Sequence, residues 1–136
     1  MGSDEMSKVL IIDDDLDITE VMRIVLGKHG HTVSAAVDGR EGLLKTRAEK
    51  PDLVILDVMM PGGPDGFEVA RELKQDPQVR GIPILMLTAI KEKTGLDFQK
   101  EAGDPDWLPV DDYCNKPLDY EILLEKVKTL LLKKKK

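Results

Sequence analysis

Acidic residues directly follow two apolar runs of the sequence and could carry out chemistry together. Asp57 follows the run Leu53–Leu56, and Asp13 and Asp14 follow a second run that ends at Ile12. Runs that are apolar throughout are typical of strands buried on both faces of a parallel sheet. Because the carboxyl ends of parallel strands share one edge of the sheet, we expect these three carboxylates to meet there.

A hydroxyl group and an ammonium group are expected at the same edge. Thr88 follows the apolar run Ile82–Leu87, and Lys116 follows the short strand Tyr113–Asn115. Neighbouring carboxylates repel one another unless a cation compensates them, and Mg²⁺ binds such oxygens while also taking a phosphoryl oxygen. A carboxylate can attack phosphorus to form an aspartyl phosphate, with a metal, an ammonium and a hydroxyl cancelling charge on the phosphoryl oxygens. The pattern therefore indicates phosphoryl transfer at Asp57.

The elements that must position these residues alternate between strand and helix five times, which predicts a parallel α/β sheet covered on both faces. The expected strands are 8–12, 31–37, 53–56, 82–87 and 113–115. The expected helices are 16–29, 39 to about 50, 67 to the turn at Asp76–Pro77, roughly 93–102, and 120 to about 132. The last helix is expected to bury Ile122, Leu123, Val127, Leu130 and Leu131.

Four sequence blocks carry a family resemblance. The blocks IIDDD, LDVMMPGGPDG, ILMLTA and DDYCNKP resemble, in order and spacing, those of CheY-like response-regulator receiver domains, and they cover nearly the whole chain. The resemblance implies a flavodoxin-like, doubly wound, five-stranded parallel sheet in the order 2-1-3-4-5 with five helices. The alternation of elements alone does not give this order.

The resemblance also implies a role for each acid. Asp57 would be the phosphoacceptor. Asp13, Asp14 and Asp57, with the backbone carbonyl of Met59, would hold Mg²⁺, for which Mn²⁺ is the alternative ion.

Further residues would bind the phosphoryl group and respond to it. By the resemblance, Thr88 and Lys116 would hold its oxygens, and Thr88 and Tyr113 would act as the switch pair. The peptide bond between Lys116 and Pro117 would be cis.

The implied function is that of a phosphoacceptor switch in a two-component phosphorelay. A sensor histidine kinase or phosphotransfer protein would dock near the first helix and donate the phosphoryl group. Phosphorylation would then change the face formed by the fourth helix, fifth strand and fifth helix, which an unknown downstream protein reads. The domain would catalyse only its own phosphorylation and dephosphorylation, and association of two copies on phosphorylation stays open.

Composition predicts one domain and its setting. We expect a flexible leader at 1–7, the receiver domain at 8–132 and a basic tail at 133–136, with no DNA-binding segment, so that the receiver stands alone. A net charge of −6 disfavours a broad nucleic-acid surface. The lone Cys114 and the lack of a membrane span or signal peptide predict a cytoplasmic protein.

Three stretches depart from the usual family pattern. The loop Gly62–Gly66 has one residue more than the common form, and the stretch Gly103–Val110, which contains Trp107, lengthens a link beside the output face. That stretch is either a packed surface loop or a partner-recognition element. Met59 and Ile90 are apolar where the hydrolytic water would pass, which predicts a long-lived phosphoryl group.

Two other functions remain open from the sequence. The residues Asp15-Leu-Asp17-Ile-Thr19 resemble the nucleophile motif of haloacid-dehalogenase-type, Mg²⁺-dependent phosphatases, although the motif begins two residues after the strand end. The third reading is a pseudo-receiver, an interaction module that is never phosphorylated. Phosphoryl labelling separates all three.

Overall fold

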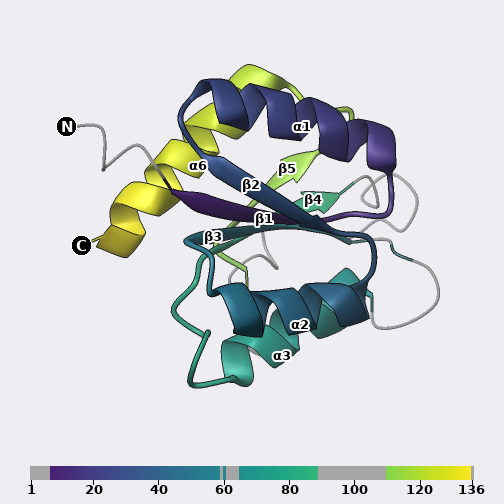
Figure 1. Cartoon of the computed structure of the whole chain (residues 1–136), viewed down its shortest axis with the longest axis vertical. Helices are drawn as coiled ribbons and strands as arrows, with labels where there is room; N and C mark the ends of the chain where they lie inside the picture. Colours follow the sequence, from purple (N-terminus) through teal and green to yellow (C-terminus); the bar gives the residue numbers. More distant parts are fainter. Residues whose placement is uncertain (1–6, 59, 61–64, 89–109, 136) are drawn as a thin grey trace.

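The strands form one parallel sheet at the centre of the molecule (Figure 1). The computed structural model describes residues 7–58, 60, 65–88 and 110–135. The sheet has five strands in the order β2-β1-β3-β4-β5, which confirms the predicted topology. The strands are β1 (Lys8–Ile12), β2 (Thr32–Ala36), β3 (Leu53–Asp57), β4 (Ile84–Thr88) and β5 (Asp112–Asn115).

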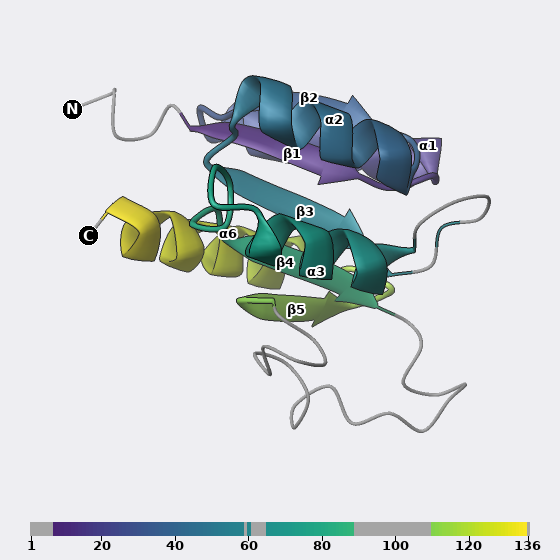
Figure 2. The same cartoon turned by 90° about the horizontal axis from the view of Figure 1, so that it is seen from below.

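In the described part of the chain, two helices cover each face of this sheet. One face carries α1 (Leu16–Lys28) and α6 (Tyr120–Lys135), and the other carries α2 (Gly39–Glu49) and α3 (Gly66–Gln75), as Figures 1 and 2 show. The further helix expected at about 93–102 lies outside the described residues. Helix α6 continues to Lys135 rather than ending near Leu132, because lysine is a good helix former and its charge suits a helix C-terminus.

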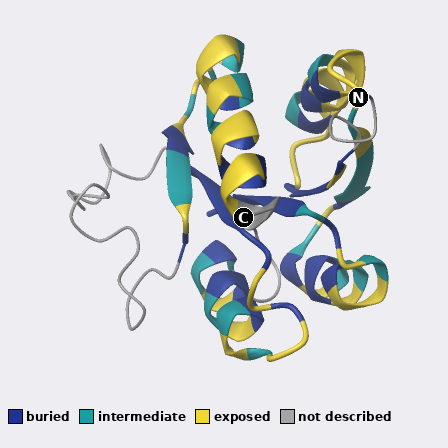
Figure 3. Ribbon diagram, turned by 90° about the vertical axis from the view of Figure 1, so that its left-hand side faces the viewer, coloured by how far each residue is buried: buried dark blue, intermediate teal, exposed yellow. Residues whose placement is uncertain are grey.

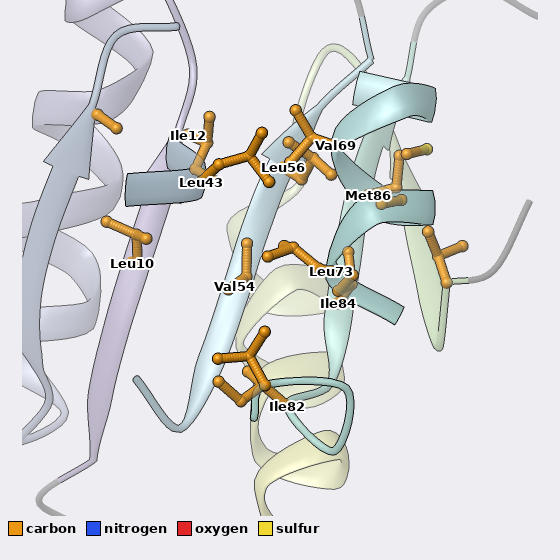
Figure 4. Close-up of a cluster of buried hydrophobic side chains, with 14 of the residues drawn as sticks. Leu10, Ile12, Leu43, Val54, Leu56, Val69, Leu73, Ile82, Ile84 and Met86 are labelled. Atoms are coloured by element: carbon orange, nitrogen blue, oxygen red, sulfur yellow. The ribbon is translucent and has the colours of Figure 1, made fainter. Parts of the chain in front are cut away.

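The sheet separates two hydrophobic cores. Successive residues of a strand point to opposite faces, so Leu10 and Ile12 pack under α2 and α3 while Val9 and Ile11 pack under α1 and α6. Figure 4 shows the first of these cores, in which Leu43 of α2 lies against side chains of the sheet. Every residue of β3 and β4 is buried, as the continuous apolar runs predicted, and the exposed residues of the helices lie on the sides that face away from the sheet (Figure 3).

Side-chain caps fix where the helices begin. Asp15 caps α1, Asp38 caps α2, and Asp65 forms a capping box with Glu68 at the start of α3. The first two caps start α1 and α2 within a few residues of the ends of β1 and β2, whereas α3 begins at Gly66, well after β3 ends at Asp57.

The buried stripe predicted for α6 was wrong at one position. Leu123, Val127, Leu130 and Leu131 are buried, whereas Ile122 has 48% of its surface exposed. Ile122 lies one residue before the buried stripe on a helix that covers only one face of the sheet, so it points toward solvent.

Candidate functional site

Three strand ends bring the predicted residues to one edge of the sheet. Asp57 is the last residue of β3, Asp13 follows β1, and Thr88 ends β4. The register pairs Ile12 of β1 with Leu56 of β3, so Asp13 and Asp57, the next residues along the chain, are neighbours. The carboxyl ends of β1, β3 and β4 therefore lie side by side at one edge of the sheet.

Lys116 joins this edge from the end of β5. Its ammonium nitrogen lies 3.1 Å from Oδ1 of Asp57 and 3.4 Å from Oδ2 of Asp13. Its backbone N–H donates to the carbonyl of Thr88 at 2.8 Å, which holds the start of the loop after β5 against β4. The Lys116–Pro117 peptide bond is cis, as the resemblance implied.

The three acids lie close enough to share one ion. Carboxylate oxygens of Asp13, Asp14 and Asp57 all fall within 4.8 Å of one another. Asp13 and Asp57 are 0% and 4% exposed, whereas Asp14 faces solvent. The backbone fixes Asp13, since its N–H donates to the carbonyl of Ala36 at 3.0 Å.

Burial is the main reason that the pKa of Asp57 rises, from its ordinary 3.8 to about 6. The charge of Asp13 raises it further, and Lys116 opposes both effects. Burial likewise raises the pKa of Asp13, although the hydrogen bond from the Asp15 N–H and the charge of Lys116 both lower it. Burial alone would lower the pKa of Lys116, but the two carboxylates outweigh it and hold that pKa above its ordinary value.

This donor set fits a small, hard divalent cation. Two buried carboxylates whose ionised forms are destabilised lie beside a third, exposed one, and a cation among them would relieve their repulsion. Hard cations such as Mg²⁺ take carboxylate oxygens and keep several waters, for which the exposed side at Asp14 leaves room. The carbonyl of Met59, implied as a further ligand, lies outside the described residues.

The two predicted switch residues occupy neighbouring strands. Thr88 is only 1% exposed, and Tyr113, on β5, is half-buried. Lys126 of α6 places its ammonium 5.1 Å from the centre of the Tyr113 ring. It also donates to the Tyr113 carbonyl at 2.5 Å and to Asp112 at 3.2 Å.

Lys126 was missed from the sequence. Its position directly before the buried Val127 was the available signal, because a long lysine stem beside a buried stripe can cover apolar surface.

A second residue missed from the sequence is Gly66, the first residue of α3. A Cβ atom on Gly66 would clash with the carbonyl oxygen of Asp57 and would lie 2.7 Å from Cα of Val58. Its N–H donates to the Val58 carbonyl at 3.0 Å. Only glycine permits this approach of α3 to the backbone of the candidate phosphoacceptor. The signal in the sequence was the Asp65-Gly66 pair opening a helix.

The nucleophile of the phosphatase alternative is placed differently. Asp15 is exposed, and its Oδ1 accepts hydrogen bonds from the N–H groups of Asp17 and Ile18 at 3.0 and 3.1 Å. It is therefore a helix cap outside the buried pair of acids, and the geometry favours Asp57 as the reactive carboxylate.

Some predicted features lie outside the described residues. These are Ile90, the side chain of Met59, most of the Gly62–Gly66 loop, and Trp107 with the rest of its stretch up to Val110. The predicted phosphoryl lifetime and the role of the Trp107 stretch stay predictions. Within the described part of the chain, no helix combines the length and apolar composition that crossing a bilayer requires.

Comparison with known proteins agrees with this geometry. Residues 9–128 match the family model described as the response regulator receiver domain. Protein PilH of Pseudomonas aeruginosa is 35% identical over 126 residues, which cover 93% of this chain and 98% of PilH. The chemotaxis protein CheY4 of Vibrio cholerae superimposes with a TM-score of 0.79 at 32% identity, over 92% of this chain and 98% of that one.

Longer relatives contain the same unit as a part. The transcriptional regulator RpaA of Synechocystis is 39% identical over 126 residues, so that the match spans 93% of this chain but only 49% of RpaA. The family model, these sequence relatives and the shared fold lead to one conclusion: this chain belongs to the response regulator receiver domain family and is a signalling domain of the two-component type.

Proposed function

We propose that Asp57 accepts a phosphoryl group from a phosphohistidine of a sensor kinase or phosphotransfer protein. The observation that carries this proposal is the buried Asp57 carboxylate, whose pKa is raised to about 6 while an ammonium group lies 3.1 Å away. Above that pH the carboxylate is mostly ionised and can act as a nucleophile. The cation beside it offsets charge on the incoming group.

In the proposed reaction, an Asp57 oxygen attacks phosphorus and the bond from phosphorus to the donor's imidazole nitrogen breaks. The electron pair returns to that nitrogen. Lys116 neutralises charge on the phosphoryl oxygens, and the buried hydroxyl of Thr88, on the adjacent strand end, donates to one of them. The chain would catalyse only this step and the loss of its own phosphoryl group.

Asp13, Asp14 and Asp57 would hold Mg²⁺, or Mn²⁺ in its place. When bound, the ion supplies positive charge that lowers the repulsion between the acids and stabilises the phosphoryl oxygens. Asp13 is held for this role by its backbone hydrogen bond to Ala36 and by the Asp15 N–H, which donates to its Oδ1 at 2.9 Å.

The signal would leave through β5 and α6. Negative charge added at Asp57 would attract the Lys116 ammonium more strongly. Because Lys116 follows β5 and its N–H is hydrogen-bonded to the Thr88 carbonyl, this attraction would act on β5, the strand that carries Tyr113. Lys126 links that strand to α6 through the Tyr113 ring and carbonyl. A downstream protein that binds the β5–α6 surface would therefore distinguish the two states.

The test is labelling with a small phosphodonor such as phosphoramidate, read by intact-protein mass spectrometry. Wild type should gain one phosphoryl group in the presence of Mg²⁺, and Asp57→Asn should gain none. Asp15→Asn is the matched control, since Asp15 is an exposed acid of the same triplet whose carboxylate caps α1.

Each rival function gives a different pattern. If Asp57→Asn were still labelled, the proposed acceptor would be refuted. If only Asp15→Asn lost the label, the phosphatase function would be favoured. Absence of labelling in every protein would identify a pseudo-receiver. Labelling of wild type at equal rate with the divalent ion chelated would refute the proposed metal site.

A further inference from the structure

Among the strands that the structure describes, β2 forms one edge of the sheet and pairs only with β1. The N–H of Thr32 donates to the carbonyl of Ser7, and the carbonyl of Ala36 accepts the N–H of Asp13, so both groups point toward β1. Because backbone groups alternate along a strand, Val33 and Ala35 direct theirs away from the sheet. An exposed edge of this kind is a template on which another strand can add.

The strand has no protection of its own against such addition. Proteins usually protect an edge with a charged residue, a proline or a bulge within the strand. The residues of β2 read TVSAA and include no charge and no proline, and they pair in unbroken register with β1. Val33, Ser34 and Ala35 are only half-buried, whereas β3 and β4 are buried throughout.

Two cations from the neighbouring helices occupy the outward carbonyl groups instead. Arg23 of α1 donates from Nη1 to the carbonyl of Val33 at 3.3 Å. Lys45 of α2 donates from Nζ to the carbonyl of Ala35 at 2.6 Å. Since α1 and α2 lie on opposite faces of the sheet, the edge is covered from both sides (Figure 1).

Helix α2 holds its lysine in this place by a stripe of residues spaced four apart. Glu41 lies 3.5 Å from the Lys45 ammonium and accepts the N–H of Val37 at 2.8 Å. Glu49, one turn beyond Lys45, accepts the hydroxyl of Ser34 at 2.7 Å. Glu41 therefore holds the Lys45 ammonium near the end of β2, while Glu49 contacts the strand itself at Ser34.

We propose that Arg23 and Lys45 close the β2 edge against strand addition by a second copy of this chain. An incoming strand needs the carbonyl groups of Val33 and Ala35 as acceptors, and it must displace both cations to reach them. The uncharged strand and the two side-chain contacts carry this inference, which does not depend on phosphorylation.

The test compares Arg23→Ala/Lys45→Ala with wild type by light scattering and by amide hydrogen exchange across a concentration series. The double variant should bind itself at least about tenfold more tightly, because two acceptors are freed for intermolecular hydrogen bonds. The amides of Val33 and Ala35, which face outward, should become protected as it associates.

Two matched controls separate edge exposure from other causes. Lys28→Ala/Arg40→Ala removes the same charge from the same two helices, at exposed residues, and should behave as wild type. Arg23→Lys/Lys45→Arg keeps both donors and should also behave as wild type. If the double alanine variant fails to fold, Lys45→Met alone, which keeps the stem, should associate more tightly than wild type.

The proposal is overturned if the double variant associates no more tightly than wild type. It is equally overturned if the Lys28/Arg40 control associates to the same extent, or if association leaves the amides of Val33 and Ala35 unprotected.

Discussion

Replacing Asp57 by asparagine should stabilise the protein in the absence of divalent ions. The rise in the pKa of Asp57 from 3.8 to about 6 corresponds to about 3 kcal/mol against the ionised form in the folded state. Asp57 is 4% exposed, so solvent does not screen this penalty. Asparagine removes the charge but leaves Lys116 with Asp13 alone, and the net gain in the free energy of unfolding should be about 1–3 kcal/mol.

The gain should depend on pH with a definite sign. Between about pH 4 and pH 6 the folded wild type binds a proton at Asp57 that the unfolded chain has released, so raising the pH through this window lowers wild-type stability. The asparagine variant lacks this loss. The difference between the two proteins should be small near pH 4 and reach its full value by about pH 7.

The assay is urea unfolding across this pH range with a chelator present. A gain of 1 kcal/mol should also raise the melting temperature by about 3 °C in a chain of this size. Adding Mg²⁺ should stabilise wild type and act weakly on the variant, because binding to the folded state adds to its stability. Glu125→Gln, an exposed acid on α6, should change nothing.

The reasoning would be refuted if Asp57→Asn were equally or less stable than wild type at pH 7 without divalent ions. A stability difference that did not fall toward pH 4 would show that the gain has another source than the ionised carboxylate.

Three further outcomes follow from the same geometry. Lys116→Met should slow phosphoryl labelling by about 100-fold or more, because a group that offsets transition-state charge is lost; an unchanged rate would contradict this role. Gly66→Ala should slow labelling by about tenfold or more, since its Cβ would displace the Asp57 backbone, whereas Gly81→Ala, whose Cβ meets nothing within 4 Å, should label as wild type. Lys126→Met should lower the free energy of unfolding by about 1–2 kcal/mol in urea and shift the ring NMR signals of Tyr113; unaltered signals would show that the cation does not hold the ring.

The sequence predicted the features that depend on local pattern. The apolar runs gave the strands and their ends, and the strand ends placed Asp13, Asp57 and Lys116 together. The strand order came from the family resemblance, since alternation of strand and helix is compatible with several orders.

The sequence predicted that these residues share one edge of the sheet, but it could not predict which of their side-chain atoms meet or at what distance. Lys116 lies 103 residues from Asp13, and the distance between their side chains depends on how every intervening element packs. The same holds for Lys126 above the Tyr113 ring and for Arg23 and Lys45 at the β2 edge, because surface lysines and arginines have many accessible rotamers.

Sheet packing also distinguishes three aspartates that look alike in sequence. Leu10 and Ile12 belong to one core and Val9 and Ile11 to the other, so sliding β1 by one residue would exchange its two faces. A one-residue deletion in β1 would still leave an aspartate at the strand end, yet it would mismatch both cores. Asp13 is buried while Asp14 and Asp15 are exposed. The hydrophobic side chains on the two faces of the sheet therefore determine which of the three acids is buried, and the acids themselves do not.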